Sequence, residues 1–279
     1  MAGIFEDMLS RYETSSSESM RNATLEVIQQ VTLAGLQRGG FFDKAAFYGG
    51  TCLRIFHGLR RFSEDMDFTL LRKNETFDIE DYFPAIISEF QSLGREVYIT
   101  KKDKKNFGKV ESAFLKDNTE VYNLSFQTEK SYKIKIEIEI DTDPPLGFKT
   151  EPKLLLQPFS FFTRTLSLPD LYAGKMHALI FRTWKNRVKG RDWYDFEWYV
   201  RNGIKLDFSH FKERTLEFNG LGITKDEFMR LLKNRFNETD IEMVKRDVRP
   251  YLTDPREIEI WSNDYFLQLA NMIKFEERI

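Results

Sequence analysis

The chain has 279 residues, 41% of them hydrophobic and 31% charged, which is typical of a globular protein with one large domain or two modest ones. Its net charge of −2 excludes a polycation that coats nucleic acid, so a nucleic-acid partner would need a local basic patch. The single cysteine, Cys52, excludes an internal disulfide, and no apolar run reaches the ~18 residues of a membrane span. We therefore expect a protein of the reducing cytoplasm, with no membrane partner.

The first half of the chain carries helical and extended patterns in alternation. Apolar spacing predicts elements over 18–38 (helix), 45–48 (strand), 51–57 (helix), 65–71 (strand) and 78–93 (helix). Residues 95–141 are mostly β in pattern, and alternating isoleucine and charged side chains predict a strand over 132–141. A further extended segment is expected near 159–165.

The second half becomes helical in pattern after Pro169. Helices are expected over 169–189, 192–201, 208–217, 224–235, 239–249 and 256–275. The predicted fold is therefore α+β, with a mixed-sheet core over residues 1–165 and an α-helical domain over residues 166–279.

The motif Gly49-Gly50-Thr51 lies where a predicted strand ends and a helix begins. At such a turn the free N–H groups, the helix dipole and the Thr51 hydroxyl suit a phosphate. Glycine is expected there because a side chain would block the approach of the phosphate. Taken alone, a motif of this length is more often structural than functional.

Two carboxylates follow on the next predicted strand. Asp65 and Asp67 are two residues apart, so they point to one face and suit a pair of hard cations such as Mg²⁺. Two such ions stabilise the attacking and leaving oxygens of a phosphoryl displacement. A third carboxylate is expected on a neighbouring strand, and the polar face of 132–141 offers Glu137, Glu139 and Asp141.

Taken together, the motifs resemble a known family. Gly49-Gly50-Thr51, the run Arg61-Phe-Ser-Glu-Asp-Met-Asp-Phe68 and the later Lys175…Arg182…Arg191-Asp192-x-x-Asp195 are similar to the AbiEii/AbiGii toxin nucleotidyltransferases, over about residues 45–200. These are bacterial toxins of abortive-infection and toxin–antitoxin systems. The resemblance implies a polymerase-β-like nucleotidyltransferase core followed by helices.

The resemblance also implies roles for the residues of the core. It assigns the triphosphate to Gly49, Gly50 and Thr51. The metals are assigned to Asp65, Asp67 and Glu139, with Glu137 as the alternative to Glu139. Ser63 is expected to orient the loop before the metal strand, and Arg61 to contact phosphate or to serve the structure.

In the helical part, the resemblance places the Lys175 ammonium near the triphosphate, and Arg182, about two turns on, shares its face. Asp192 and Asp195 are implied in activity, together with Arg191 beside them. The residues alone also fit a structural role for Asp192, which would cap its helix or pair with an arginine.

The implied reaction moves a nucleoside monophosphate from an NTP to an acceptor hydroxyl, with Mg²⁺ or Mn²⁺, in a toxin that has a cognate antitoxin. The resemblance favours RNA, at a tRNA 3′ end, as acceptor. Basic residues at 101–109 and 182–191 offer patches for it, with Trp184, Trp193 and Tyr194 as stacking surfaces. The alternatives are a small-molecule (antibiotic-type) nucleotidyltransferase, transfer to a protein, and an inert NTP- or protein-binding module.

Overall fold

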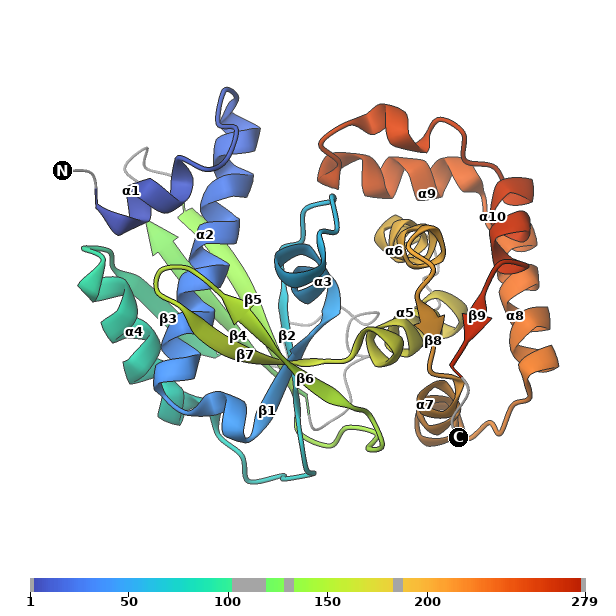
Figure 1. The fold of residues 1–279 in the computed structure, drawn as a ribbon, viewed down its shortest axis with the longest axis horizontal. Coiled ribbons are helices and arrows are strands. Elements are labelled where there is room, and N and C mark those ends of the chain that lie inside the picture. The colour runs from blue at the N-terminus through green and yellow to red at the C-terminus, as the bar shows by residue number, and fades with distance from the viewer. Residues whose placement is uncertain (1–2, 102–118, 128–132, 183–187, 277–279) are drawn as a thin grey trace. The chain divides into compact units, whose positions relative to one another are not determined.

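The computed structural model describes residues 3–101, 119–127, 133–182 and 188–276 (Figure 1). The chain forms two compact units. The first contains Met1–Gly58, Ser63–Pro144 and Thr150–Thr165, and the second contains Leu59–Phe62, Pro145–Lys149 and Leu166–Ile279. The short segment Leu59–Phe62 therefore belongs to the second unit, although both its neighbours in sequence belong to the first.

A seven-stranded mixed sheet forms the centre of the first unit (Figure 1). Its strands in spatial order are β3 (Val97–Lys101), β4 (Thr119–Gln127), β5 (Lys133–Asp141), β2 (Met66–Leu70), β1 (Ala45–Tyr48), β7 (Phe161–Leu166) and β6 (Thr150–Leu155). Strand β2 is parallel to β5 and antiparallel to β1, while β1 is parallel to β7 and β4 is antiparallel to both β3 and β5. The predicted α+β class with a mixed sheet is confirmed.

Strand β5 is the clearest case of a sequence pattern that becomes a face of the sheet. Its isoleucines at 134, 136, 138 and 140 are at most 1% exposed, whereas Glu137, Glu139 and Asp141 between and after them are only half-buried. Alternation of this kind buries one face in the core and leaves the other for polar side chains. The polar face is the one that carries the predicted carboxylates.

Helices α1 (Ile4–Leu9), α2 (Ser17–Arg38), α3 (Gly49–His57) and α4 (Phe83–Ser92) complete the first unit. The start of α2 is fixed by a capping box, in which Ser16 and Ser19 bond each other's backbone. Helix α2 packs closely against α4, because a Cβ on Gly35 would lie 2.6 Å from the Cα of Ile86. Both helices also contact the sheet, α2 at β5 and α4 at β3.

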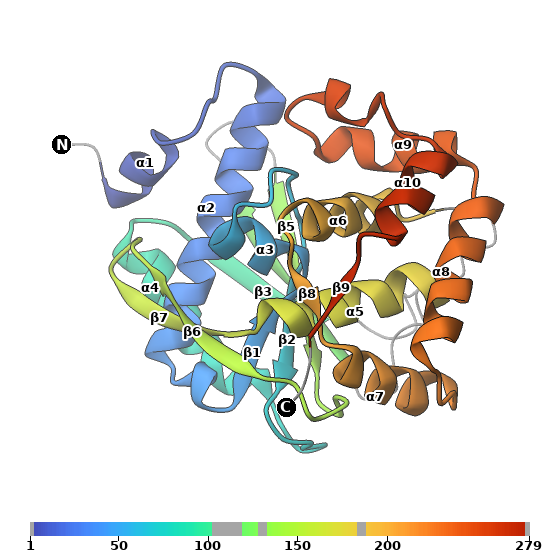
Figure 2. The same cartoon turned by 45° about the vertical axis from the view of Figure 1, so that its right-hand side comes forward.

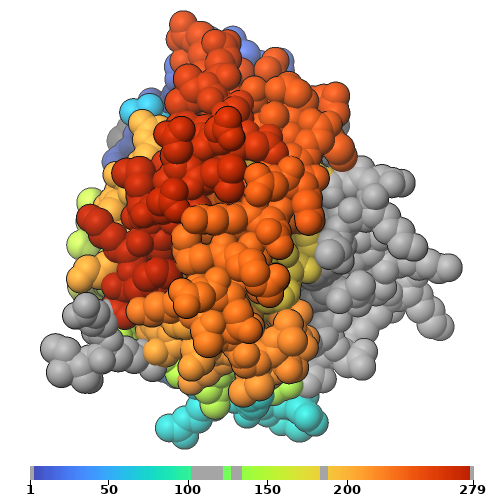
Figure 3. Space-filling view, turned by 90° about the vertical axis from the view of Figure 1, so that its right-hand side faces the viewer, coloured from blue at the N-terminus to red at the C-terminus, as the bar shows by residue number. Residues whose placement is uncertain are grey.

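The second unit is mainly helical (Figure 2). Its helices are α5 (Leu168–Phe181), α6 (Gly190–Arg201), α7 (Phe208–Asn219), α8 (Lys225–Glu238), α9 (Ile241–Val248) and α10 (Asn263–Ala270), with the short paired strands β8 (Lys205–Leu206) and β9 (Lys274–Phe275). Figure 3 views this unit from the face formed by α7, α8 and the C-terminal segment. In its core Trp193 contacts the rings of Phe236 and Phe266 at centroid distances of 4.9 and 4.7 Å.

Two predicted helices need correction, and one strand is missing from the prediction. The helix predicted over 256–275 is wrong: a 3-10 turn (Pro255–Ile258) is followed by α10, which starts anew because Ser262 caps the N–H of Tyr265, and then by β9. The helix predicted over 169–189 ends at Phe181, and residues 183–187 lie outside the described part. Strand β6 was not predicted, because it is a half-exposed edge strand that contains Pro152.

No helix in the described part of the chain is long and apolar enough to cross a membrane.

Candidate active site

The turn between β1 and α3 is built around Asp67. Gly49, the first residue of α3, has φ +83°, and a Cβ added there would overlap the Asp67 carboxylate. Glycine is therefore required at this position by the close approach of Asp67 as well as by its left-handed backbone. The sequence predicted a glycine that makes room for phosphate, whereas in the structure the room is taken by the neighbouring carboxylate.

The residues just before β2 are anchored from two sides. Thr51 is fully buried, and its hydroxyl donates to the backbone carbonyl of Asp65 at 2.5 Å. The side-chain amide of Gln29 donates to the carbonyls of Ser63 and Glu64 at 3.0 and 3.1 Å. The expectation that the Thr51 hydroxyl binds phosphate is thus corrected, because this hydroxyl fixes the strand that carries the aspartates. Tyr48 supplies no side-chain cap at the start of α3. Of the groups at this turn that the sequence predicts to bind phosphate, the backbone N–H groups can therefore still donate to an anion.

The sequence motifs do not point to Gln29. It lies within a long apolar stretch of α2 and is 1% exposed. A buried amide in such a stretch must find partners within the protein, which is the signal that would have pointed to it.

The register of the parallel pair β2–β5 brings two carboxylates together. Asp67 is the direct partner of Glu139, and both side chains are half-buried. Tyr48 of β1 pairs with Asp67 from the other side. The pairing begins at Met66 and Ile138, so Glu137 lies one position before the first pair, and Asp141 lies beside the buried Thr69. Of the three carboxylates offered by β5, Glu139 is therefore the neighbour of Asp67.

The donor set fits a divalent metal that is shared with a substrate. Asp65, Asp67 and Glu139 are partly exposed oxygen donors: Asp67 and Glu139 are paired on neighbouring strands, and Asp65 lies directly before β2. Within the described residues no three His, Cys, Asp or Glu side chains converge closely enough to enclose a metal by themselves. Mg²⁺ is usually bound by one or two carboxylates together with substrate phosphates, so a pair such as Asp67 and Glu139 matches that mode.

A second group of predicted residues forms a buried charge cluster within the second unit. The guanidinium of Arg61 pairs with both carboxylate oxygens of Asp195 at 2.6 Å each, and these side chains are 1% and 0% exposed. The Nη1 of Arg61 also donates to the carbonyl of Phe62, whose N–H donates to the carbonyl of Tyr251. Arg61 thus holds the segment before β2 within the second unit, and its contact with Asp195 leaves it no access to phosphate from solvent.

Lys175 continues the cluster between two aspartates. Its Nζ lies 2.7 Å from Asp195 and 3.3 Å from Asp192, and Arg182 reaches the other oxygen of Asp192 at 3.2 Å. Burial would raise the pKa of both aspartates, but the nearby cations outweigh it. Arg61 and Lys175 hold the pKa of Asp195 below its ordinary value, while Lys175, Arg182 and Lys189 lower that of Asp192. Both carboxylates are therefore ionised at neutral pH.

Several residues considered for RNA contacts are not exposed. Trp193 and Tyr194 are 1% and 7% exposed, so the expectation that they stack on a base is wrong. The Tyr194 hydroxyl instead donates to Glu257 at 2.8 Å, and Arg191 lies over the ring of Tyr251. Trp184 and the basic residues between 102 and 109 lie outside the described residues.

Comparison with known proteins identifies the fold. A family model described as "Nucleotidyl transferase AbiEii toxin, Type IV TA system" matches residues 31–278. The solved structure of the JHP933 protein from Helicobacter pylori is similar, with a TM-score of 0.54 and 18% identity over 90% of this chain and 89% of that one. A second H. pylori structure, of a candidate nucleotidyltransferase, has a TM-score of 0.52 and 17% identity over 92% and 93%. No curated protein matches the sequence significantly.

The Arg61–Asp195 pair predicts a large and coupled effect on stability. Replacing Arg61 by Met leaves a buried carboxylate with one cation fewer, so we expect a loss of about 3–5 kcal/mol in the free energy of unfolding, and a similar loss for Asp195→Asn. The double variant should lose much less than the sum of the two, because neither charge is then left behind. Chemical unfolding followed by tryptophan fluorescence measures this, since all four tryptophans lie between residues 184 and 261.

The matched control is Arg256→Met, which removes an exposed arginine from its pair with Asp254 and should leave the unfolding midpoint unchanged. Strictly additive losses for Arg61→Met and Asp195→Asn would contradict the assigned pairing.

Proposed function

This chain belongs to the nucleotidyl transferase AbiEii toxin family of type IV toxin–antitoxin systems, and we propose that it transfers a nucleoside monophosphate from an NTP to an RNA hydroxyl, at the 3′ end of a tRNA, with Mg²⁺. Membership makes the chain a nucleotidyltransferase that uses an NTP, and it implies an antitoxin partner. The observation that carries the proposed site is the register of β2 with β5, which sets Asp67 beside Glu139.

In the proposed reaction the acceptor oxygen forms a bond to the α-phosphorus, the α–β phosphoanhydride bond breaks and pyrophosphate leaves. Glu139 accepts the proton of the acceptor hydroxyl, directly or through a water molecule. Asp65, Asp67 and Glu139 would hold the divalent ions, which supply charge neutralisation on the phosphates when bound. Gly49 leaves space for the Asp67 carboxylate, and the backbone N–H groups at the start of α3 would donate to a phosphate.

Lys175 is suited to hold a phosphate because its ammonium group is already oriented. An ammonium carries three N–H donors. Two of them are directed to Asp192 and Asp195, which leaves the third for a phosphate oxygen. Asp192 and Asp195 are in this proposal positioning residues for Lys175, and Arg182 is a second phosphate ligand that Asp192 orients.

Membership of the toxin family favours RNA as the acceptor. Toxins that act by nucleotidyl transfer need an acceptor whose loss harms the cell, and the 3′ end of a tRNA meets that requirement. The burial of Trp193 and Tyr194 means that base stacking on these rings does not contribute. Backbone recognition through cations remains, since phosphate contacts position RNA without reading its sequence.

Radiolabel transfer tests this function. The protein is incubated with Mg²⁺, total tRNA and each NTP in turn, labelled at the α-phosphate. We expect label on tRNA from one NTP, and a loss of about 100-fold or more in Asp67→Asn, because that change removes a metal-binding charge and keeps the shape. The matched control is Asp81→Asn, an exposed aspartate of the same unit, which should label tRNA as the wild type does.

The other possible outcomes separate the alternatives. Label on a small hydroxyl compound and none on RNA would point to the antibiotic-type enzyme, and label on a polypeptide would point to protein modification. NTP binding with no label on any acceptor would contradict the transferase proposal and leave an inert binding module.

Gly49→Ala should abolish transfer because a methyl group there displaces the Asp67 carboxylate. We expect a fall of about 100-fold in kcat, in line with the cost of a misplaced reacting group. Gly58→Ala is the matched control, because Gly58 also has a positive φ, of +75°, but a Cβ there meets no atom within 4 Å. It should lower stability slightly and leave kcat unchanged, whereas equal losses of kcat in both variants would contradict the role given to Gly49.

A further inference from the structure

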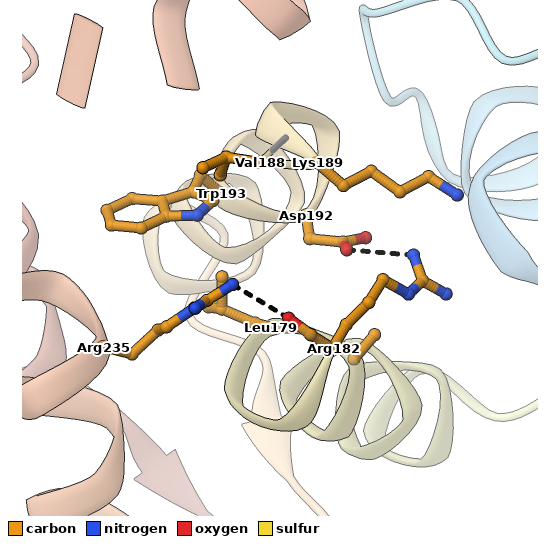
Figure 4. A pocket seen from close by; sticks show the side chains of 8 residues that line it. Leu179, Arg182, Val188, Lys189, Asp192, Trp193 and Arg235 are labelled. Atoms are coloured by element: carbon orange, nitrogen blue, oxygen red, sulfur yellow. Dashed lines mark hydrogen bonds and ion pairs between the residues drawn. The ribbon is translucent and has the colours of Figure 1, made fainter. Parts of the chain in front are cut away.

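A recess in the second unit carries more positive charge than its carboxylate can balance (Figure 4). It lies where the end of α5, the start of α6 and helix α8 meet, and it is lined by Leu179, Arg182, Lys189, Asp192, Trp193 and Arg235 among others. Three of these are cations and one is an anion. Asp192 is already shared by Lys175 and Arg182, and Arg235 also interacts with Glu238 of its own helix.

Lys189 differs from the other cations of this cluster in its contacts. Its ammonium makes no ion pair with any residue in the described ranges, whereas Lys175 and Arg182 both do. Burial and the nearby Arg182 lower the pKa of Lys189 to about 8; Arg191 and Lys175 add to this and Asp192 opposes it. An amine among like charges is a costly arrangement that a bound anion relieves.

The surrounding side chains hold this arrangement in place. In Figure 4 the side chains of Lys189, directly before α6, and Arg182, directly after α5, lie on either side of the Asp192 carboxylate. Arg235 of α8 donates from Nη2 to the carbonyl of Arg182 at 2.9 Å, which fixes the end of α5. The N–H of Gly190, next to Lys189, donates to Asp247 at 2.8 Å, which fixes the start of α6.

We propose that Lys189 is a further phosphate ligand and that, with Arg182 and Lys175, it binds the polyphosphate of the substrate NTP. This assignment rests on the proposed function and adds a residue to its phosphate site. The guanidinium of Arg182 offers a planar fork for two phosphate oxygens, and the Lys189 ammonium adds a point charge. Asp192 lies between them and orients Arg182 and Lys175, which accounts for a buried carboxylate in a site for an anion.

The test uses inorganic tripolyphosphate as the probe, in EDTA, so that binding reports the cations and requires neither metal nor catalysis. Calorimetric titration should give an affinity about ten-fold or more weaker for Lys189→Gln than for the wild type. Lys189→Arg, which keeps the charge, should restore most of it. Lys212→Gln, an exposed lysine of α7 in the same unit, should bind as the wild type does.

Two further readouts separate binding from structure. Removing a cation from a cation-rich cluster should leave the unfolding temperature of Lys189→Gln unchanged or raise it. Between pH 7 and 9 the affinity of the wild type relative to Lys189→Arg should fall about ten-fold, because the lysine loses its proton above a pKa of about 8 and the arginine does not.

Equal affinity of Lys189→Gln and the wild type for tripolyphosphate would overturn the proposal, and so would a raised KM for tRNA alone, which would assign Lys189 to RNA phosphates. A lower unfolding temperature that Lys189→Arg does not restore would also overturn it. Weaker tripolyphosphate binding in Lys189→Gln would support the site even if no acceptor were labelled, so this result stands apart from the outcome of the transfer assay.

Discussion

The parallel pairing of β2 with β5 is the constraint on which the proposed chemistry of the first unit depends. It makes Asp67 and Glu139 direct partners, while the buried isoleucines on the other face of β5 prevent a one-residue slip that would turn the carboxylates inward. Residues of neighbouring elements hold Asp67 and its strand in position. Gly49 gives the Asp67 carboxylate its space, and Thr51 and Gln29 fix the backbone just before the strand.

The second unit is organised by a chain of alternating charges, from Arg61 through Asp195, Lys175 and Asp192 to Arg182. Buried ion pairs contribute little net stability compared with a well-packed apolar core, but removing one member is expensive. Such a chain therefore fixes the position of each member more than it stabilises the fold. We infer that the arrangement keeps Lys175 and Arg182 in a defined orientation for an anion. Arg61 also links this cluster to the chain four residues before Asp65.

The sequence predicts most of the fold, and the reasons for the exceptions are physical. A long apolar stretch identified α2, strict alternation identified β5, and apolar spacing identified the helices from α6 to α9, whereas the edge strand β6 and the broken region after residue 255 have weak local patterns. The motifs identified the residues that gather in each unit. They could not tell that the Thr51 hydroxyl and the Arg61 guanidinium are used inside the protein, because those partners, the Asp65 carbonyl and Asp195, are set by tertiary packing. The choice between Glu137 and Glu139 likewise required the strand register.

The register of β2 with β5 can be tested with two neighbouring glutamates. Glu137 and Glu139 are two residues apart on the same face of β5 and are both half-buried, so Glu137→Gln and Glu139→Gln are matched variants that remove one charge each. We would measure kcat for nucleotidyl transfer in the two variants and the wild type. We expect a loss of about 100-fold or more for Glu139→Gln and a change of less than about three-fold for Glu137→Gln. A loss confined to Glu137→Gln, with Glu139→Gln as active as the wild type, would contradict the assignment of Glu139 to the metal site.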